Sequence, residues 1–415
     1  MLREFARFAA RTFFRDIVVD GAENLPEQGP VIFTPNHPNG LLDPMLLFFL
    51  PSRFRLRFVA KATLFKIPVF GSILRSIGSI PVVRKFEAGG EVDYTAFFAS
   101  CVQALAEGDC IVIFPEGRSL PQSYLAPLKT GPARLFLMAR EKGIPVKIVS
   151  IGLNYEKGET FRSRVLMRIA PPLQEPDLSG LELSDAVRQL TEKLTDSLED
   201  NVIQAQSYRE RELMTLLETL SAQDDPDQAE FMRFTRLKEF ERGLSRLRVS
   251  AANEIDSLRE LLSRYDRLSR EYGIETDFRS GLSFRKITSA ILGALLAIPG
   301  WIFNFIPYHV CDLLIKASGR DAADAATFKV IYSLFLFPIS YALEGYFINR
   351  LLGPGYAILF SLLILPFSYF TLIYMEWYES QLGGVFWPRN RQRMRAQLER
   401  LRDRILEQLE KIRTL

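Results

Sequence analysis

Three apolar segments near the C-terminal end restrict the structures that this chain can adopt more than any other feature of its sequence. Residues 287–311 and 351–375 carry no charged side chain, and residues 330–348 carry a single one, Glu344. A helix crosses the hydrocarbon core of a bilayer with about 20 apolar residues, and its backbone must be hydrogen-bonded internally there. The sequence therefore predicts an integral membrane protein, with Glu344 near enough to the end of its segment to reach the interface.

The first apolar segment differs from the other two because it contains helix-breaking residues. Pro299 and Gly300 fall in its middle, and Pro307 lies near its end. We expect them to interrupt the helix, so that residues 287–311 dip into the bilayer and two full spans remain. Residues 389–413 carry nine Lys or Arg against four acids, which favours the cytoplasmic side. We predict an even number of spans, with both ends of the chain on that side.

The rest of the chain is long enough for several units outside the membrane. At 415 residues it exceeds one ordinary core, and its net charge of +3 gives no support for nucleic-acid binding. The three cysteines form neither a metal-binding spacing nor a disulfide framework, and the N-terminus is not a signal peptide. We predict an interfacial amphipathic helix (1–16), an α/β domain (17–205), a charged helical segment (206–280), the membrane region (281–380) and a basic amphipathic C-terminal helix (381–415).

Residues 2–16 place aromatic side chains on one helical face and arginines on another. This pattern suits a helix in a membrane interface, and equally a helix that packs on its own domain.

Short β-branched runs and helical periods alternate over residues 17–175. The runs VIFTPN, LRFVA, SIPVVR, CIVIFPEG and VKIVSIGLNY end in turn-forming residues, and helical periods lie at 41–50, 64–77, 92–107 and 131–142. The alternation predicts an α/β fold with a largely parallel sheet flanked by helices. In such sheets the functional loops gather where the strands end.

One of only two histidines, His37, follows the first of these runs in TPNHPNGLLDP. Asp43 lies six residues later and can fold back onto the imidazole. A carboxylate bonded to one ring nitrogen fixes the tautomer and leaves the other nitrogen free to accept a proton. The pair indicates a general base for a substrate hydroxyl, although a lone histidine more often has a structural role.

Basic residues follow two further strands at the same expected edge. Arg84 ends GSIPVVR, and Glu116, Gly117 and Arg118 follow CIVIFP. Lys129 stands just before a helix whose N-terminus would also favour an anion. Guanidinium groups form paired charge-assisted bonds with phosphate, so this edge suits a phosphate group.

Four sequence blocks occur in the order NHPNGLLDP, GSIPVVR, FPEGRS and IPVKIVSIGLNY. Together they resemble the glycerophospholipid acyltransferase family, which includes lysophosphatidic acid and glycerol-3-phosphate acyltransferases, over about residues 10–205. The resemblance implies that His37 is the general base and that Asp43 orients it. It also implies that the second and third blocks bind the acceptor's phosphate through Gly78, Arg84, Glu116, Gly117 and Arg118, next to Lys129.

Two departures from the family pattern bear on the acceptor. Five residues separate His37 from Asp43 where the family has four, and the third block lacks the Thr of Phe-Pro-Glu-Gly-Thr-Arg-Ser. These departures, together with membrane helices at the C-terminal end, make the chain resemble the fungal-type glycerol-3-phosphate/dihydroxyacetone-phosphate acyltransferase branch.

The resemblance implies a membrane-bound O-acyltransferase of phospholipid biosynthesis whose catalytic domain faces the cytoplasm among membrane lipids. It would move a fatty acyl chain from acyl-CoA or acyl carrier protein to glycerol-3-phosphate, dihydroxyacetone phosphate or lysophosphatidic acid. No metal or other cofactor is expected, and no Ser or Cys lies in a nucleophile-elbow pattern.

Two alternatives remain open at this point. One is a membrane-anchored lipid-binding or scaffold protein with an inactive acyltransferase domain, and intact His37 and Asp43 count against it. The other is a hydrolase that uses water, and the missing nucleophile elbow and the arginines count against that.

Overall fold

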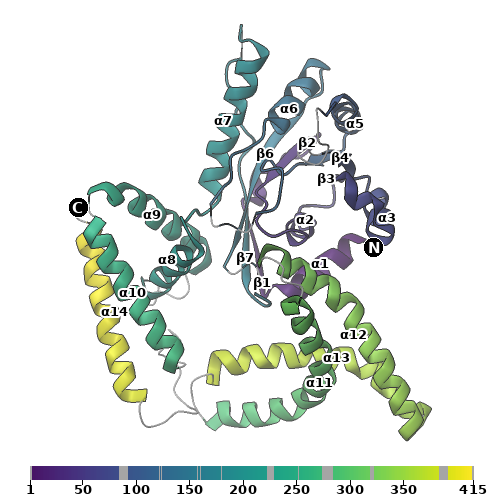
Figure 1. Cartoon of the computed structure of the whole chain (residues 1–415), viewed down its shortest axis with the longest axis vertical. Helices are drawn as coiled ribbons and strands as arrows, with labels where there is room; N and C mark the ends of the chain where they lie inside the picture. Colours follow the sequence, from purple (N-terminus) through teal and green to yellow (C-terminus); the bar gives the residue numbers. More distant parts are fainter. Residues whose placement is uncertain are drawn as a thin grey trace. The chain divides into compact units, whose positions relative to one another are not determined.

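The structure is a computed structural model (Figure 1). It describes residues 2–83, 92–120, 122, 124–156, 158, 160–178, 180–221, 229–250, 252–272, 284–317, 322–382 and 391–413. The chain divides into two compact units. The first is Met1–Tyr208 with Asp321–Thr327, and the second is Arg209–Arg320 with Phe328–Leu415.

A seven-stranded sheet with strand order β1-β7-β6-β2-β5-β3-β4 forms the centre of the first unit. The strands are β1 (Asp16–Asp20), β2 (Val31–Pro35), β3 (Leu56–Lys61), β4 (Ile80–Val82), β5 (Cys110–Val112), β6 (Lys147–Tyr155) and β7 (Arg164–Ile169). Strands β6, β2, β5, β3 and β4 run parallel, whereas β7 is antiparallel to β6 and parallel to β1. The largely parallel sheet is confirmed. The sequence pattern did not predict β1 and β7, because charged residues at their ends interrupt the apolar run.

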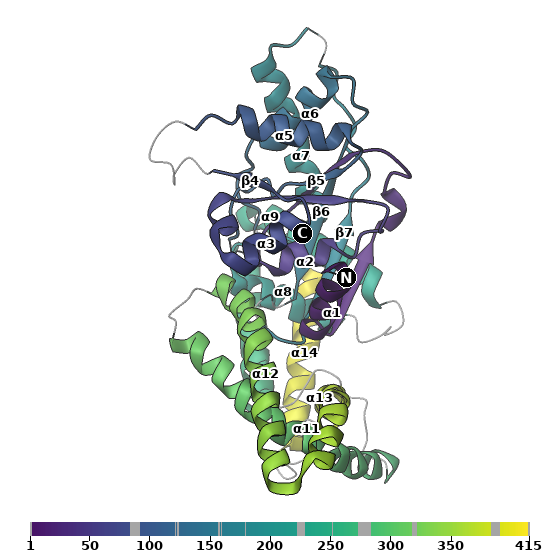
Figure 2. The same cartoon turned by 90° about the vertical axis from the view of Figure 1, so that its right-hand side faces the viewer.

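Helices cover both faces of this sheet (Figure 2). They are α1 (Leu2–Phe13), α2 (Leu42–Leu47), α3 (Pro68–Ser76), α5 (Thr95–Ala106), α6 (Gly131–Glu141) and α7 (Leu183–Asn201), with short 3-10 turns η1 (Ala22–Asn24) and η2 (Ala62–Lys66). Helices α5, α6 and α7 share one core with Ile32, Ile111 and Ile148 of the sheet. Alternate residues point to the other face, where Phe33 meets Phe54 with ring centroids 5.4 Å apart. Apolar burial on both faces explains why these strands lack alternating polarity.

Helix α1 packs on its own domain. Ala6 and Phe13 are buried, and the guanidinium groups of Arg3 and Arg7 donate to backbone carbonyls at the end of α2, including Phe48 O at 3.0 and 2.8 Å. These bonds satisfy carbonyls that the end of a helix leaves without partners. Phe8 remains 65% exposed, so an apolar face of α1 stays open.

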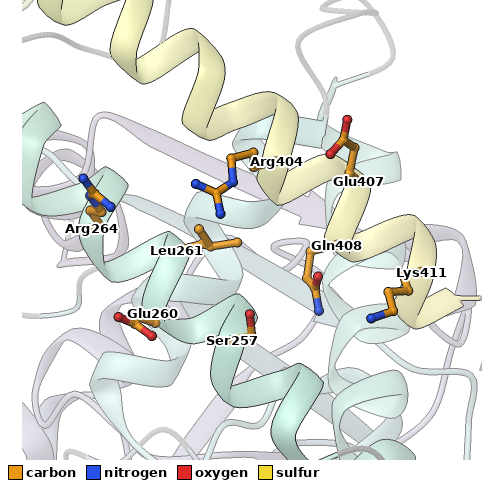
Figure 3. A pocket seen from close by; sticks show the side chains of 8 residues that line it. All are labelled: Ser257, Glu260, Leu261, Arg264, Arg404, Glu407, Gln408 and Lys411. Atoms are coloured by element: carbon orange, nitrogen blue, oxygen red, sulfur yellow. The ribbon is translucent and has the colours of Figure 1, made fainter.

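Four helices of the second unit form a charged bundle: α8 (Tyr208–Ser221), α9 (Ala229–Ser250), α10 (Ala252–Tyr272) and α14 (Arg391–Arg413). Their buried faces are apolar and include Leu217, Leu237, Leu258, Ile405 and Leu409. Glu254 of α10 accepts from Gln408 at 2.6 Å and from Lys411 at 3.1 Å, both on α14. A polar groove between α10 and α14 carries side chains of both charges (Figure 3). The basic C-terminal helix is therefore partnered by α10.

Three long apolar helices belong to the second unit, apart from the first residues of α12: α11 (Phe284–Ala317), α12 (Ala322–Leu352) and α13 (Pro354–Leu382). By length and composition, the segments Thr288–Ala317, Phe328–Leu352 and Pro354–Tyr378 could each cross a membrane. Large apolar side chains on all three stay exposed, as expected for helices that face lipid.

The expected interruption of the first apolar segment is wrong, because α11 continues through Pro299 and Pro307. Gly300 does not break the helix; it allows α13 to pack closely against α11. A Cβ atom there would lie 2.2 Å from Thr371 Oγ1 and 2.5 Å from the Phe367 carbonyl oxygen of α13. Small residues allow such close approach between helices in membranes, and prolines are tolerated within them.

Helix α11 contacts both of its neighbours at the ends that lie away from the α12–α13 turn. Its Ala290 carbonyl accepts from Tyr374 near the end of α13 at 2.6 Å. Its Cys311 lies beside Ser333 near the start of α12, with Sγ and Oγ 3.7 Å apart. In between, Asn304 donates to Ser368 of α13 at 2.7 Å and accepts from Tyr341 of α12 at 2.6 Å.

Candidate active site

His37 and Asp43 form a hydrogen-bonded pair just beyond the end of β2. Nδ1 of His37 lies 2.7 Å from Oδ2 of Asp43, whose side chain is completely buried in α2. The His37 side chain is 15% exposed, and its Nε2 has no hydrogen-bond partner among the described residues. The imidazole also stacks on Phe114, with ring centroids 4.0 Å apart. This geometry favours a proton on Nδ1 and leaves Nε2 free to accept one.

Two asparagines shape the loop that carries His37. The Asn36 amide exchanges two hydrogen bonds with the Leu153 backbone of β6, at 2.6 and 3.2 Å, and so continues the β2–β6 ladder by one residue. The Asn39 backbone N–H donates to Asp43 Oδ2 at 2.8 Å. The chain therefore leaves the sheet at His37 and turns back at once into α2, which explains how six residues bring Asp43 under the imidazole.

Glu116 joins the loops after β2 and β5. Its Oε1 accepts from the His37 backbone N–H at 2.6 Å, and its Oε2 accepts from the Ala126 N–H at 3.3 Å. Leu120 N–H in turn donates to the His37 carbonyl at 3.0 Å. Burial raises the pKa of Glu116, and its backbone donors oppose the shift in part. This buried carboxylate is a link between loops, so it is not placed to bind a phosphate as the sequence resemblance implied.

Basic groups lie beside this pair of loops. Arg118 is exposed, one residue after Gly117, which adopts a left-handed φ of 75°. A Cβ atom on Gly117 would lie 3.5 Å from Cγ of Lys129, so the stem of Lys129 runs alongside the turn. Lys129 N–H donates to the Pro115 carbonyl at 2.7 Å, and α6 begins two residues later. Two cations and a helix N-terminus are thus gathered at one edge.

One other expected residue, Gly78, is not brought to this edge. Gly78 precedes β4 and lies beside the Arg57 side chain, at the edge where the parallel strands begin. His37 lies at the edge where the parallel strands end, and only loops that follow those strands share this edge. Gly78 precedes its strand, so it lies outside the phosphate site. Arg84 follows β4 and lies outside the described residues, so its role stays a sequence prediction.

Tyr155 is a member of the site that the sequence analysis missed. It is the last residue of β6, and its hydroxyl donates to Oδ1 of Asp43. Burial raises its pKa well above the ordinary value, and the neighbouring Asp43 carboxylate adds to the shift. The hydroxyl is therefore a donor at neutral pH. Its only signal in the sequence is the position at the end of a long apolar strand.

The remaining candidates for covalent or metal chemistry are poorly suited to it. Cys110 is buried in β5, and burial raises its pKa to about 11, which suppresses the nucleophilic thiolate. Among the residues that the structure describes, no group of three His, Cys, Asp or Glu side chains is arranged to hold a metal ion. The site thus holds a histidine–carboxylate pair at one edge of an α/β sheet, with cations beside it.

Comparisons with known proteins place this domain in a family. The family model described as Acyltransferase matches residues 16–153. Glycerol-3-phosphate O-acyltransferase 1 of Saccharomyces cerevisiae is 24% identical over 266 residues, which cover 59% of this chain and 34% of the yeast protein. The chloroplastic 1-acyl-sn-glycerol-3-phosphate acyltransferase BAT2 of Brassica napus is 27% identical over 157 residues, 36% of this chain and 43% of that protein.

A solved structure, that of the 1-acyl-sn-glycerophosphate (LPA) acyltransferase PlsC from Thermotoga maritima, aligns with a TM-score of 0.35 and 24% identity, over 46% of this chain and 76% of that one. Residues 16–153 are an acyltransferase-family domain, which confirms the resemblance seen in the sequence. The chain spans less than half the length of the curated yeast and plant relatives named here.

Proposed function

We propose that this protein is a membrane-bound O-acyltransferase that moves a fatty acyl chain from acyl-CoA to the hydroxyl of a glycerol-phosphate-type acceptor. The observation that carries the proposal is the 2.7 Å bond from His37 Nδ1 to buried Asp43, within a domain of the acyltransferase family. The names of the yeast and plant relatives support glycerol-3-phosphate or its monoacylated form as the acceptor.

In the proposed reaction, His37 Nε2 takes the proton of the acceptor hydroxyl as the hydroxyl oxygen attacks the thioester carbonyl. Asp43 stabilises the imidazolium that forms, because its buried carboxylate faces Nδ1. The tetrahedral intermediate then expels the thiolate of CoA, which takes the proton back from Nε2. The products are an ester and a free thiol, and His37 returns to its starting tautomer.

Arg118 and Lys129 are proposed to bind the acceptor's phosphate. Both are exposed at the edge where His37 emerges, and Lys129 lies alongside the Gly117 turn. Paired bonds from a guanidinium and the positive end of α6 would fix the phosphate while the acceptor hydroxyl meets Nε2.

Purified protein supplied with acyl-CoA and one acceptor at a time tests this function. Glycerol-3-phosphate, dihydroxyacetone phosphate and lysophosphatidic acid are the acceptors, and released CoA and acylated product are both measured. We expect product and CoA to appear in equal amounts with at least one acceptor. Release of CoA with no acylated product would instead support a hydrolase, and no turnover with any acceptor would support a scaffold.

We further propose that the acyltransferase domain and α14 both face the cytoplasm. Among the described residues before α11, the apolar helix Thr95–Ala106 is too short to cross a bilayer. The charged bundle then holds α10 and α14 together through Glu254 and Lys411, so both lie on one side of the membrane. The apolar region between them must therefore leave the membrane by the face at which it entered, after an even number of crossings.

The contacts of α11 favour α12 and α13 as the two spans. Consecutive in the chain and joined at Gly353, they form a hairpin in which Gly345 faces Phe360. The start of α12 and the end of α13 thus lie at the open end of the hairpin. Because the two ends of α11 contact those same regions, α11 is proposed to lie across the open end of the hairpin as an unbroken helix that does not complete a crossing.

A further inference from the structure

The Asp43 carboxylate accepts from three donors on two segments, the loop after β2 and the end of β6. Oδ2 accepts from His37 Nδ1 at 2.7 Å and from the Asn39 N–H at 2.8 Å. Oδ1 accepts from the Tyr155 hydroxyl on β6. Asp43 has no exposed side-chain surface, so its charge depends on these donors for compensation. Among the described residues, only Tyr155 donates to the oxygen that points away from the histidine.

The Tyr155 ring is itself held in place by neighbouring structure. It packs on Phe14, with ring centroids 5.5 Å apart at 39°, and Phe14 is completely buried. Strand β6 extends four residues past Ile151, the partner of Pro35 at the end of β2. The hydroxyl therefore reaches Asp43 from a neighbouring strand and is not carried by the loop that it supports.

Fixing both carboxylate oxygens has a direct consequence for His37. If Oδ1 lost its donor, the buried carboxylate could relieve its charge only by rotating or by taking a proton. Either change removes the acceptor that keeps the proton on Nδ1. In the part of the chain that the structure describes, the titratable groups that face the imidazole or Asp43 are Glu116, from the loop after β5, and Tyr155, from β6.

We propose that Tyr155 is a positioning residue, whose hydroxyl holds Asp43 in the orientation that keeps the His37 proton on Nδ1. Its effect on rate rests on the proposed acyl-transfer function, whereas its effect on the imidazole does not. Tyr155 touches neither substrate nor the reacting nitrogen, so its loss lowers kcat and leaves the KM for the acceptor unchanged.

The test compares Tyr155→Phe with Tyr94→Phe in the full-length protein. Phenylalanine keeps the ring that packs on Phe14 and removes only the hydroxyl. Tyr94, just before α5, packs near Phe97, and among the described residues it bonds to neither His37 nor Asp43. The imidazole is observed directly by 15N NMR of histidine-labelled protein, because the chain has only two histidines and a His309→Gln variant assigns them. This measurement needs no substrate, so it stands even if no acceptor is turned over.

We expect Nδ1 of His37 to give the protonated 15N signal in the parent and in Tyr94→Phe, and an averaged tautomer signal in Tyr155→Phe. In the acylation assay, kcat for Tyr155→Phe should fall about 10- to 100-fold, the range for one lost hydrogen bond to a charged group. Adding Tyr155→Phe to Asp43→Asn should cause no further loss. An unchanged 15N signal, a change confined to KM, additive losses in the double variant, or a Tyr155→Phe protein that does not fold would each overturn the proposal.

Discussion

Replacing Glu116 with Gln should loosen the connection between the two loops of the site. The change keeps the size of the side chain but turns one acceptor oxygen into an NH2 donor. Glu116 is buried and faces two backbone donors, His37 N–H at 2.6 Å and Ala126 N–H at 3.3 Å. One of these N–H groups must then face another donor at a buried position.

The size of the effect follows from the bonds that change. One hydrogen bond to a charged group contributes about 1.5–3 kcal/mol, and the second becomes a weaker bond to a neutral amide. We therefore expect a loss of about 2–3 kcal/mol in the free energy of unfolding. For a unit of this size that is a fall of about 4–12 °C in Tm. Because the His37 backbone shifts with the loop, kcat should also fall, by up to about 100-fold.

A thiol-reactive dye measures this unfolding selectively in a Cys311→Ser background. The two remaining thiols, Cys101 and Cys110, are both buried in the acyltransferase domain and become reactive only when it unfolds. Glu141→Gln is the matched control, since Glu141 is exposed at the end of α6. A Glu116→Gln protein that melts with the control and keeps the parent's kcat would refute the linking role of this carboxylate.

Three further outcomes follow from the same structure. Arg118→Ala should raise the KM for the acceptor about tenfold or more and leave that for acyl-CoA unchanged, and equal effects on both would remove it from the phosphate site. Gly300→Leu should destabilise the α11–α13 contact by about 1–3 kcal/mol in thermal unfolding, whereas Gly355→Leu, with open space around it, should not. Single cysteines at Glu23 and Glu410 of an otherwise cysteine-free chain should react alike with an impermeant reagent in sealed vesicles, and opposite accessibility would rule out an even number of spans.

The sequence was sufficient for the parallel strands and for the contact between His37 and Asp43. Both depend on local patterns: β-branched runs that end in turn residues, and an acid close enough in the chain to return to its histidine. The sequence pattern did not reveal β1 and β7, at one end of the sheet, because their apolar runs are short and bounded by charges. Their pairing depends on tertiary contacts and not on a local sequence pattern.

Three residues show what the sequence pattern could not predict, because their roles depend on tertiary structure. Gly78 belongs to a family block, but a residue that precedes a parallel strand lies at the opposite edge from one that follows it. Tyr155 meets Asp43 through the register of β6 on β2, which no local pattern encodes. Gly300 resembles a helix breaker in sequence, and only the approach of α13 shows that its missing side chain makes room for a neighbour.

The central claim is that His37 acts as the base, and the rate of acyl transfer by His37→Ala tests it most directly. His309→Ala, at the chain's other histidine, is the control, and Tm of both variants is measured alongside kcat. We expect His37→Ala to retain the parent's Tm and to lose about 100- to 10,000-fold in kcat, the range for removal of a general base, while His309→Ala keeps the parent's rate. A folded His37→Ala protein that transfers acyl chains at the parent's rate would contradict the account.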